Sequence, residues 1–181
     1  MKTKSIPVLL AAGAMAIASS TVANAADTPE FSFSCQVKEG VPTTVAQSVD
    51  GSSEMPVFHW KAEALDNRTS SSPDELCSSV SQKLADLSAE YDISNISFIG
   101  TEQAGVPMIC ANTDSQECGN VLFTLNKTTE KPSVVAGNVV DSILAQNLQP
   151  EKKEFSTRGI QSFAYQVNFW SLLGLKFSDK Y

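Results

Sequence analysis

The chain of 181 residues contains four cysteines and one histidine, the side chains best suited to metal binding, redox chemistry or nucleophilic catalysis. The cysteines are Cys35, Cys77, Cys110 and Cys118. None of them belongs to a CxxC pair, the close spacing that is typical of zinc sites and redox-active disulfides. An even number of cysteines in an exported chain is typical of structural disulfides instead. We therefore predict two disulfide bonds, no metal site and no cofactor.

His59 is the only histidine, so any Ser/His/Asp or Cys/His arrangement would have to use it. In the stretch MPVFHWK it alternates with Phe58 and Trp60, which places it on the opposite face of a strand from those two rings. We favour a solvated strand histidine, because a general base needs an orienting partner that the sequence does not reveal. No GxSxG, P-loop or HExxH motif occurs, and the loop ANTDSQE lacks the ligand spacing of an EF-hand.

The first residues of the chain indicate export. Two lysines precede an apolar run from Ile6 to Ile17, which is too short to span a bilayer. Ala23-Asn24-Ala25 then fits the small-x-small rule for cleavage. We predict a signal peptide over residues 1–25 and localisation in the periplasm or cell envelope. No second apolar run of about 20 residues follows, so we expect no internal membrane span.

The expected mature chain, residues 26–181, is acidic. Removing Lys2 and Lys4 from the 13 basic residues leaves 11, against 20 acidic residues, so its net charge is −9. This charge repels phosphate backbones, and we expect no nucleic-acid partner. Its length suits one domain that buries roughly two thirds of its unfolded surface.

The elements around the cysteines predict how the cysteines pair. Residues 106–111 and 121–126 read as two strands of a hairpin, with Cys110 and Cys118 facing each other across its mouth. Cys35 lies on the inward face of an alternating strand over residues 31–37. Cys77 lies beside the apolar stripe of a helix that begins at a Ser72-Pro73-Asp74-Glu75 capping box. We therefore predict the pairs Cys35–Cys77 and Cys110–Cys118.

Together with further strands over residues 42–47, 55–61 and 94–101 and a second helix over residues 133–148, these elements follow the order β-β-β-α-β-β-β-α. The order predicts a single α+β domain over residues 26–150, in which an antiparallel sheet of about six short strands is covered by two helices.

The segment 151–181 differs from the rest of the chain. It holds seven of the 14 aromatic residues and carries five basic against three acidic residues. As a helix it could rest on an anionic membrane or a partner, with contacts from the residues Phe163, Tyr165, Phe169, Trp170, Lys152, Lys153 and Arg158. Residues 163–169 also alternate strictly, as in a strand that pairs with the sheet of the domain itself. The sequence leaves both readings open.

An ordered set of short motifs over about residues 31–148 resembles the circadian oscillating protein family of cyanobacteria. The motifs are Phe33-x-Cys35, Pro42-Thr43-Thr44-Val45, Pro56-Val57-x-x-Trp60, Pro73-x-x-x-Cys77-x-x-Val80-Ser81, Pro107-x-Ile109-Cys110 and Cys118-x-x-x-Leu122-Phe123-Thr124-Leu125. The resemblance implies an exported protein, associated peripherally with the cell membrane, whose abundance follows a daily rhythm. It implies no catalytic residues. His59 departs from the family pattern, which has arginine beside the tryptophan.

We therefore expect a non-catalytic exported protein that binds a membrane surface or an envelope protein. One alternative is a secreted inhibitor or ligand-binding module that presents the loop 111–117, although this loop lacks the aromatic and arginine anchors typical of binding hot spots. Another is a hydrolase that uses His59, which would require a cleft with a carboxylate and a serine or threonine nearby. The sequence leaves the oligomeric state open.

Overall fold

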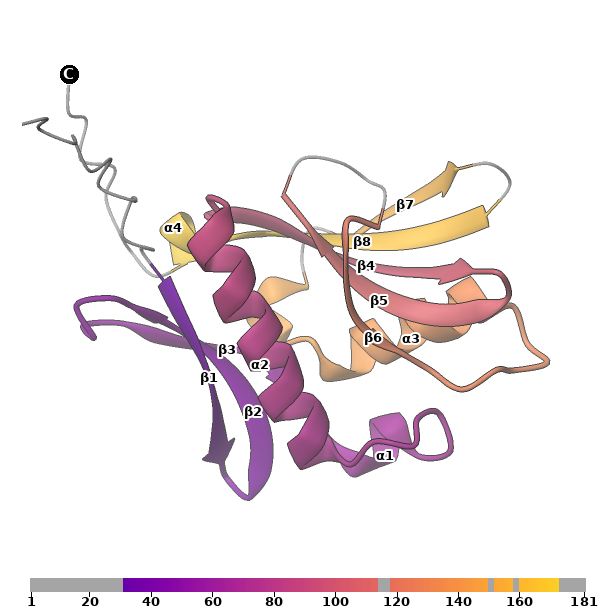
Figure 1. Ribbon diagram of the computed structural model, residues 1–181, viewed down its shortest axis with the longest axis horizontal. Coiled ribbons are helices and arrows are strands. Elements are labelled where there is room, and N and C mark those ends of the chain that lie inside the picture. The colour runs from indigo at the N-terminus through magenta and orange to yellow at the C-terminus, as the bar shows by residue number, and fades with distance from the viewer. Residues whose placement is uncertain (1–30, 114–117, 150–151, 158–159, 173–181) are drawn as a thin grey trace, which may run out of the picture.

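The computed structural model describes residues 31–113, 118–149, 152–157 and 160–172. In chain order its elements are β1 (Phe31–Lys38), β2 (Val41–Ser48), β3 (Glu54–His59), α1 (Ala62–Leu65), α2 (Pro73–Glu90), β4 (Asn95–Gln103), β5 (Val106–Asn112), β6 (Asn120–Thr124), α3 (Pro132–Ile143), the 3-10 helix η1 (Gln146–Leu148), β7 (Lys152–Thr157), β8 (Ile160–Asn168) and α4 (Phe169–Leu172). The strands form two antiparallel sheets, one with the order β1-β2-β3 and the other with the order β6-β5-β4-β8-β7 (Figure 1).

The predicted α+β class is confirmed, with two long helices and two disulfides. The expected single sheet of about six strands is instead two sheets of three and five strands. The residues after α3 explain why β3 does not join the two sheets. Leu144 forms a bridge with Phe58, and the Ala145 N–H donates to the Val57 carbonyl over 3.0 Å. These contacts occupy the outer edge of β3, which is therefore not paired with a strand of the larger sheet.

Helix α2 covers one face of the three-stranded sheet (Figure 1). Its start has the predicted capping box, in which the Glu75 N–H donates to Ser72 Oγ and Glu75 Oε2 accepts from the Ser72 N–H. Three leucines and Val80 form the buried stripe of the helix together with Cys77 and Ser81. The stripe packs into the main core, to which both sheets and α3 also contribute.

Helix α3 packs against β4, β5 and β8 of the five-stranded sheet. The opposite face of that sheet has a smaller apolar cluster of Ile99, Met108, Cys110 and Ala164, with Cys118 packed beside it. The Cys110–Cys118 disulfide therefore closes the β5–β6 connection next to a buried cluster rather than over open surface.

The segment expected as a tail supplies two strands of the larger sheet. β8 lies between β4 and β7, with Ile96 of β4 opposite Val167 and Lys153 of β7 opposite Ala164. Of the two readings that the sequence left open, the structure has the strand. In this strand Phe163, Tyr165 and Val167 all point to the side of the sheet that carries α3 and the main core, as the alternation requires.

Candidate functional site

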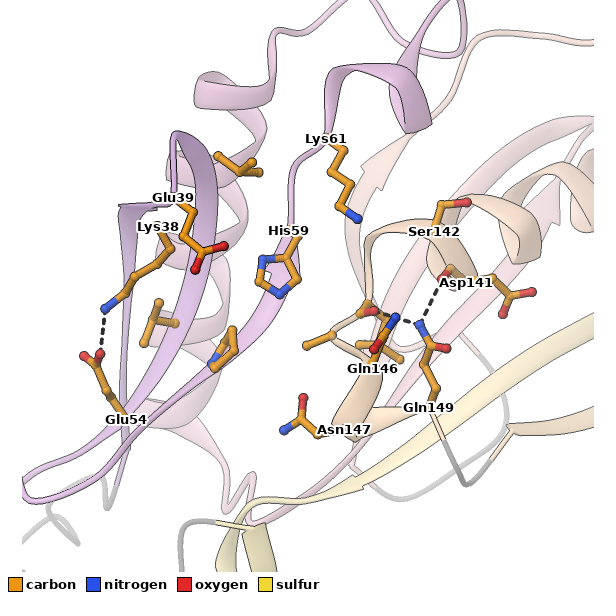
Figure 2. A pocket seen from close by; sticks show the side chains of 15 residues that line it. Lys38, Glu39, Glu54, His59, Lys61, Asp141, Ser142, Gln146, Asn147 and Gln149 are labelled. Atoms are coloured by element: carbon orange, nitrogen blue, oxygen red, sulfur yellow. Dashed lines mark hydrogen bonds and ion pairs between the residues drawn. The ribbon is translucent and has the colours of Figure 1, made fainter.

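The face of the three-stranded sheet turned away from α2 borders a cleft of about 1020 Å³ (Figure 2). Val45 and Pro56 form part of its floor, and Leu144 and Ala145 form part of the facing wall. Gln146, Asn147 and Gln149 line the same wall beyond them. A cleft of this size, with an apolar floor and a polar rim, has the ordinary form of a ligand site.

Strand alternation determines which side chains reach the cleft. Val45 of β2 lines it, whereas Thr44 and Ala46 face α2. A register shift between Thr44 and Val45 in the pairing with β3 marks an irregularity in the middle of the sheet. Val45 is only 1% exposed although it lines the cleft.

His59 stands half-buried at one end of the cleft, beside Thr43. The Thr43 hydroxyl donates its single proton to the Val41 carbonyl over 3.0 Å. Its contact of 3.3 Å with His59 Nδ1 must then be one in which Nδ1–H donates to the hydroxyl oxygen. In the neutral imidazole this assignment leaves Nε2 as an unprotonated acceptor on a ring that lines the cleft.

Burial lowers the pKa of His59, and the neighbouring Lys61 ammonium lowers it further, while Glu39 opposes the shift. The imidazole is therefore neutral at neutral pH. This places a hydrogen-bond acceptor, and not a cation, between one acidic and one basic side chain.

Some of the charged side chains around the cleft form an ion pair with another described residue, and some do not. Lys38 and Glu54 form an ion pair of 2.6 Å, and the hydrogen bond and charge of Lys38 lower the pKa of the Glu54 carboxyl. The Asp141 carboxylate points away from His59 in Figure 2. The side chains of Glu39 and Lys61 make no ion pair or hydrogen bond with any other residue that the structure describes.

The hydrolase alternative required a carboxylate and a serine or threonine beside His59. Thr43 does contact His59, but its hydroxyl proton is directed to Val41, away from the ring. Ser142 lines the cleft and donates to the Asn138 carbonyl over 2.8 Å. Within the described ranges no carboxylate lies in ion-pair contact with His59. The site therefore supplies a base without an aligned nucleophile.

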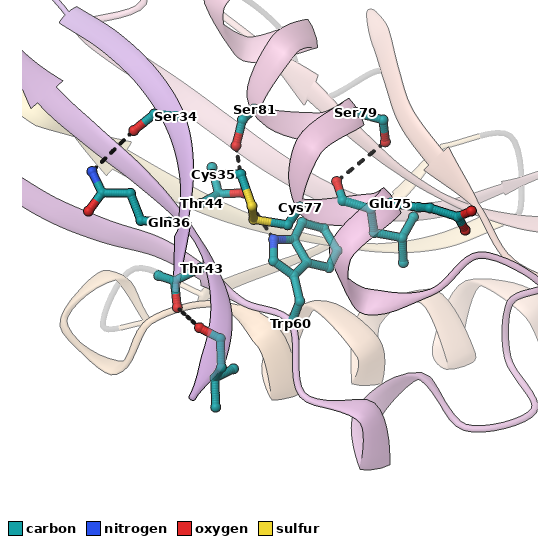
Figure 3. The surroundings of a disulfide bond; sticks show 12 residues. Ser34, Cys35, Gln36, Thr43, Thr44, Trp60, Glu75, Cys77, Ser79 and Ser81 are labelled. Carbon is teal, nitrogen blue, oxygen red and sulfur yellow. Dashed lines mark hydrogen bonds between the residues drawn. A yellow bond between two sulfur atoms is a disulfide. The ribbon is translucent and has the colours of Figure 1, made fainter. Parts of the chain in front are cut away.

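Both predicted disulfides are present, and each has a Cα–Cα distance of 5.4 Å. Figure 3 shows Cys35–Cys77 beside a buried polar cluster, in which Trp60 Nε1 donates to Thr44 Oγ1 over 2.9 Å and Ser81 Oγ donates to the same oxygen over 3.1 Å. This disulfide joins β1 to α2 on the face opposite the cleft.

The residues proposed for membrane or partner contact lie elsewhere. Tyr165 and Phe169 are 1% and 0% exposed, so their burial argues against a surface role. Phe163 is half-buried near Gly137 of α3, and exposed Lys153 donates to Gln166 Oε1 over 3.2 Å. Arg158 and the side chains of Lys152 and Trp170 lie outside the described residues, as do residues 114–117 of the loop 111–117.

Sequence reasoning missed the cleft itself, and with it Glu39, Lys61 and residues 144–149. Glu39 carried a partial signal in the sequence, because it precedes Gly40 between two strands. In the structure both residues have positive φ in this turn. The far wall carried none, because residues 144–149 meet β3 only through tertiary contacts.

Within the described residues, no cluster of three or more His, Cys, Asp or Glu side chains could hold a metal ion. No helix in the same part of the chain has the length and apolarity required to cross a membrane.

Fold and site define a disulfide-bonded α+β protein with a cleft beside the smaller of its two sheets. The family model for circadian oscillating protein COP23 matches residues 32–173, and the chain belongs to this family. The match extends beyond the expected limit near residue 148 and includes β7 and β8. Neither a curated protein nor a solved structure matches the chain.

Proposed function

We propose that this member of the circadian oscillating protein family is an exported protein of the cell envelope that binds a ligand in the His59 cleft and catalyses no reaction. The observation that carries the proposal is the neutral imidazole of His59 at the end of a cleft of about 1020 Å³. Its hydrogen bond with Thr43 fixes the ring and leaves Nε2 as an acceptor for a bound molecule.

Exported localisation rests on the signal-peptide pattern of residues 1–25 and on the two disulfides, which form and persist in oxidising compartments. Cell fractionation with an antibody against the protein tests it. Recovery from the envelope or periplasm as a chain beginning at Ala26 is the expected result, and recovery of the uncleaved chain from the cytoplasm would contradict it.

Binding in the cleft is tested by filling the cleft. Asn147 is exposed on the far wall, so Asn147→Trp places a large ring in the opening without disturbing a buried contact. Asn138→Trp is the matched control, because Asn138 is exposed on α3 and lies outside the cleft lining. Each protein is incubated with envelope extract, and the molecules that copurify are compared by mass spectrometry.

We expect a component that copurifies with the wild-type protein and with Asn138→Trp, and that Asn147→Trp loses. A copurifying set that is identical for all three proteins would show that the cleft is not the binding site.

The hydrolase reading differs in one measurable respect. An esterase, phosphatase and peptidase screen should detect no activity, because the base at His59 has no aligned nucleophile. Activity that disappears in His59→Ala would replace the binding proposal with catalysis.

A further inference from the structure

Two opposite charges near His59 lack partners within the described part of the chain. Glu39 and Lys61 both act electrostatically on the imidazole, with opposite signs, so both lie close to it. Figure 2 shows the Glu39 carboxylate and the Lys61 ammonium on opposite sides of the ring. The Lys38–Glu54 pair shows that charges on this rim do pair when geometry allows. The separation of Glu39 from Lys61 leaves one anion and one cation available to a ligand.

The third polar feature is the acceptor between these charges. His59 Nε2 carries a lone pair, because Nδ1–H is held by Thr43, whose own proton is directed to Val41. A ligand must therefore offer a donor at this point. An N–H group meets the requirement, whereas a second acceptor would face the lone pair of Nε2 unfavourably.

The cleft below these groups also has apolar lining. Val41 and Pro56 are half-buried in it, and Val45, Leu144 and Ala145 line it with exposures of at most 3%. Burial of an apolar side chain here would contribute about 25 cal/mol for each Å² removed from water. The site thus combines an apolar surface with three polar groups of different kinds.

We propose that the cleft binds an amphoteric ligand with an apolar body, the class formed by apolar amino acids and short apolar peptides; this inference rests on the proposed function. The ligand carboxylate pairs with Lys61, its ammonium pairs with Glu39, and an N–H group donates to His59 Nε2. A simple anion would meet the Glu39 carboxylate and the acidic body of the protein. A simple cation would meet the Lys61 ammonium.

Isothermal titration calorimetry at pH 7.5 with the purified protein tests this assignment. The probes are leucine, the dipeptide Leu-Leu, its N-acetyl derivative and its C-terminal amide. Leucine and Leu-Leu separate the two sources of the same chemistry. The two derivatives each remove one charge and keep the apolar body.

We expect leucine or Leu-Leu to bind. Loss of the ligand ammonium in the N-acetyl derivative, or of the ligand carboxylate in the amide, should weaken binding about fivefold, the upper range for an exposed ion pair. Glu39→Gln should weaken Leu-Leu by a similar factor and leave the N-acetyl derivative unchanged. Lys61→Gln should likewise weaken the binding of Leu-Leu and leave the binding of the C-terminal amide unchanged. Glu63→Gln on α1 and Lys127→Gln are matched controls outside the cleft lining, and they should bind as the wild type does.

Equal affinity for all forms of the dipeptide, or no binding of any probe, would overturn the amphoteric assignment. If a component of the envelope extract still depends on an open cleft in the comparison of Asn147→Trp with Asn138→Trp, the proposed function stands and only the ligand class is wrong. If that dependence is also missing, the proposed function fails as well.

Discussion

Gly100 of β4 lies against Gly137 of α3 so closely that a Cβ atom on Gly100 would stand 2.6 Å from the Gly137 backbone nitrogen. A Cβ atom on Gly137 would in turn stand 2.5 Å from the Phe163 ring of β8. The two glycines thus allow the helix to lie directly on the middle of the larger sheet.

Substitution of these glycines should give unequal effects. Gly100→Ala pushes against backbone atoms of α3 and should lower the free energy of unfolding by about 1–3 kcal/mol. Gly137→Ala pushes against a side-chain ring and gains about 1 kcal/mol of helix propensity, so its net effect should be smaller. Urea unfolding of both variants measures the difference, and an undiminished stability of Gly100→Ala would contradict the close contact.

Thr44 should be more important for stability than its size suggests. Its hydroxyl oxygen accepts from Trp60 Nε1 and from Ser81 Oγ in the interior between β2 and α2. Thr44→Val leaves both buried donors without this acceptor and should cost about 1–3 kcal/mol. Thr44→Ser keeps the hydroxyl and serves as the control. A Val variant that is as stable as the Ser variant in a denaturant titration would exclude this role.

The two disulfides should contribute differently. Cys35–Cys77 closes a separation of 42 residues and Cys110–Cys118 a separation of 8. The chain-entropy relation gives about 4 kcal/mol for the first and about 2.5 kcal/mol for the second. The double alanine variant of each pair, measured by urea unfolding, should follow this order. The reverse order would mean that effects other than the entropy of the unfolded chain dominate.

Asp50, in the turn between β2 and β3, should titrate at low pH. A hydrogen bond from the Ser48 hydroxyl of 2.6 Å, together with bonds from the Ser52 N–H and hydroxyl, lowers its pKa to about 2. Since the folded-state pKa lies below the ordinary value of 3.8, the stabilisation is complete above about pH 3.8 and is lost as the pH falls through about 2.

NMR titration of the Asp50 carboxyl carbon measures this pKa directly. Ser48→Ala should raise it toward the ordinary value, because the largest contribution is removed. A pKa that Ser48→Ala leaves unchanged would show that other interactions, and not the Ser48 hydrogen bond, lower the pKa of Asp50.

A chain that ends at Gln149 should fail to fold cooperatively. It lacks β7 and β8, and β8 is the strand that pairs with β4 in the middle of the larger sheet. Tyr165, Val167 and Phe169 would be missing from the main core. Near-ultraviolet circular dichroism and a urea transition like those of the full chain would contradict this expectation.

Local signals predicted several elements correctly. Ser72 to Glu75 predicted the start of α2, because a capping box depends only on residues three apart. Alternation placed Cys35 inward, and helical spacing placed Cys77 beside the buried stripe, so their pairing followed. The Cys110–Cys118 pair followed from a hairpin, which is also a local feature.

The features that sequence reasoning missed depend on contacts between distant segments. The predicted second helix ran to residue 148, but α3 ends at Ile143 because Leu144 and Ala145 extend along β3. The same contact separates the two sheets and forms the far wall of the cleft. Residues 163–169 fit both a helix and a strand, and only the vacant edge of β4 selects the strand.

The position of β8 also has a consequence for the synthesis of the protein. Ile96 of β4 pairs with Val167, which lies about 70 residues later in the chain. At 5–20 residues per second, the ribosome needs roughly 4–14 s to produce that partner. Throughout this interval β4 has one unpaired edge, and its side chains Ile96 and Phe98 lack the strand that completes their cover. The larger sheet of a nascent chain therefore cannot be completed before almost the whole polypeptide has been made, and this delay exposes an aggregation-prone edge.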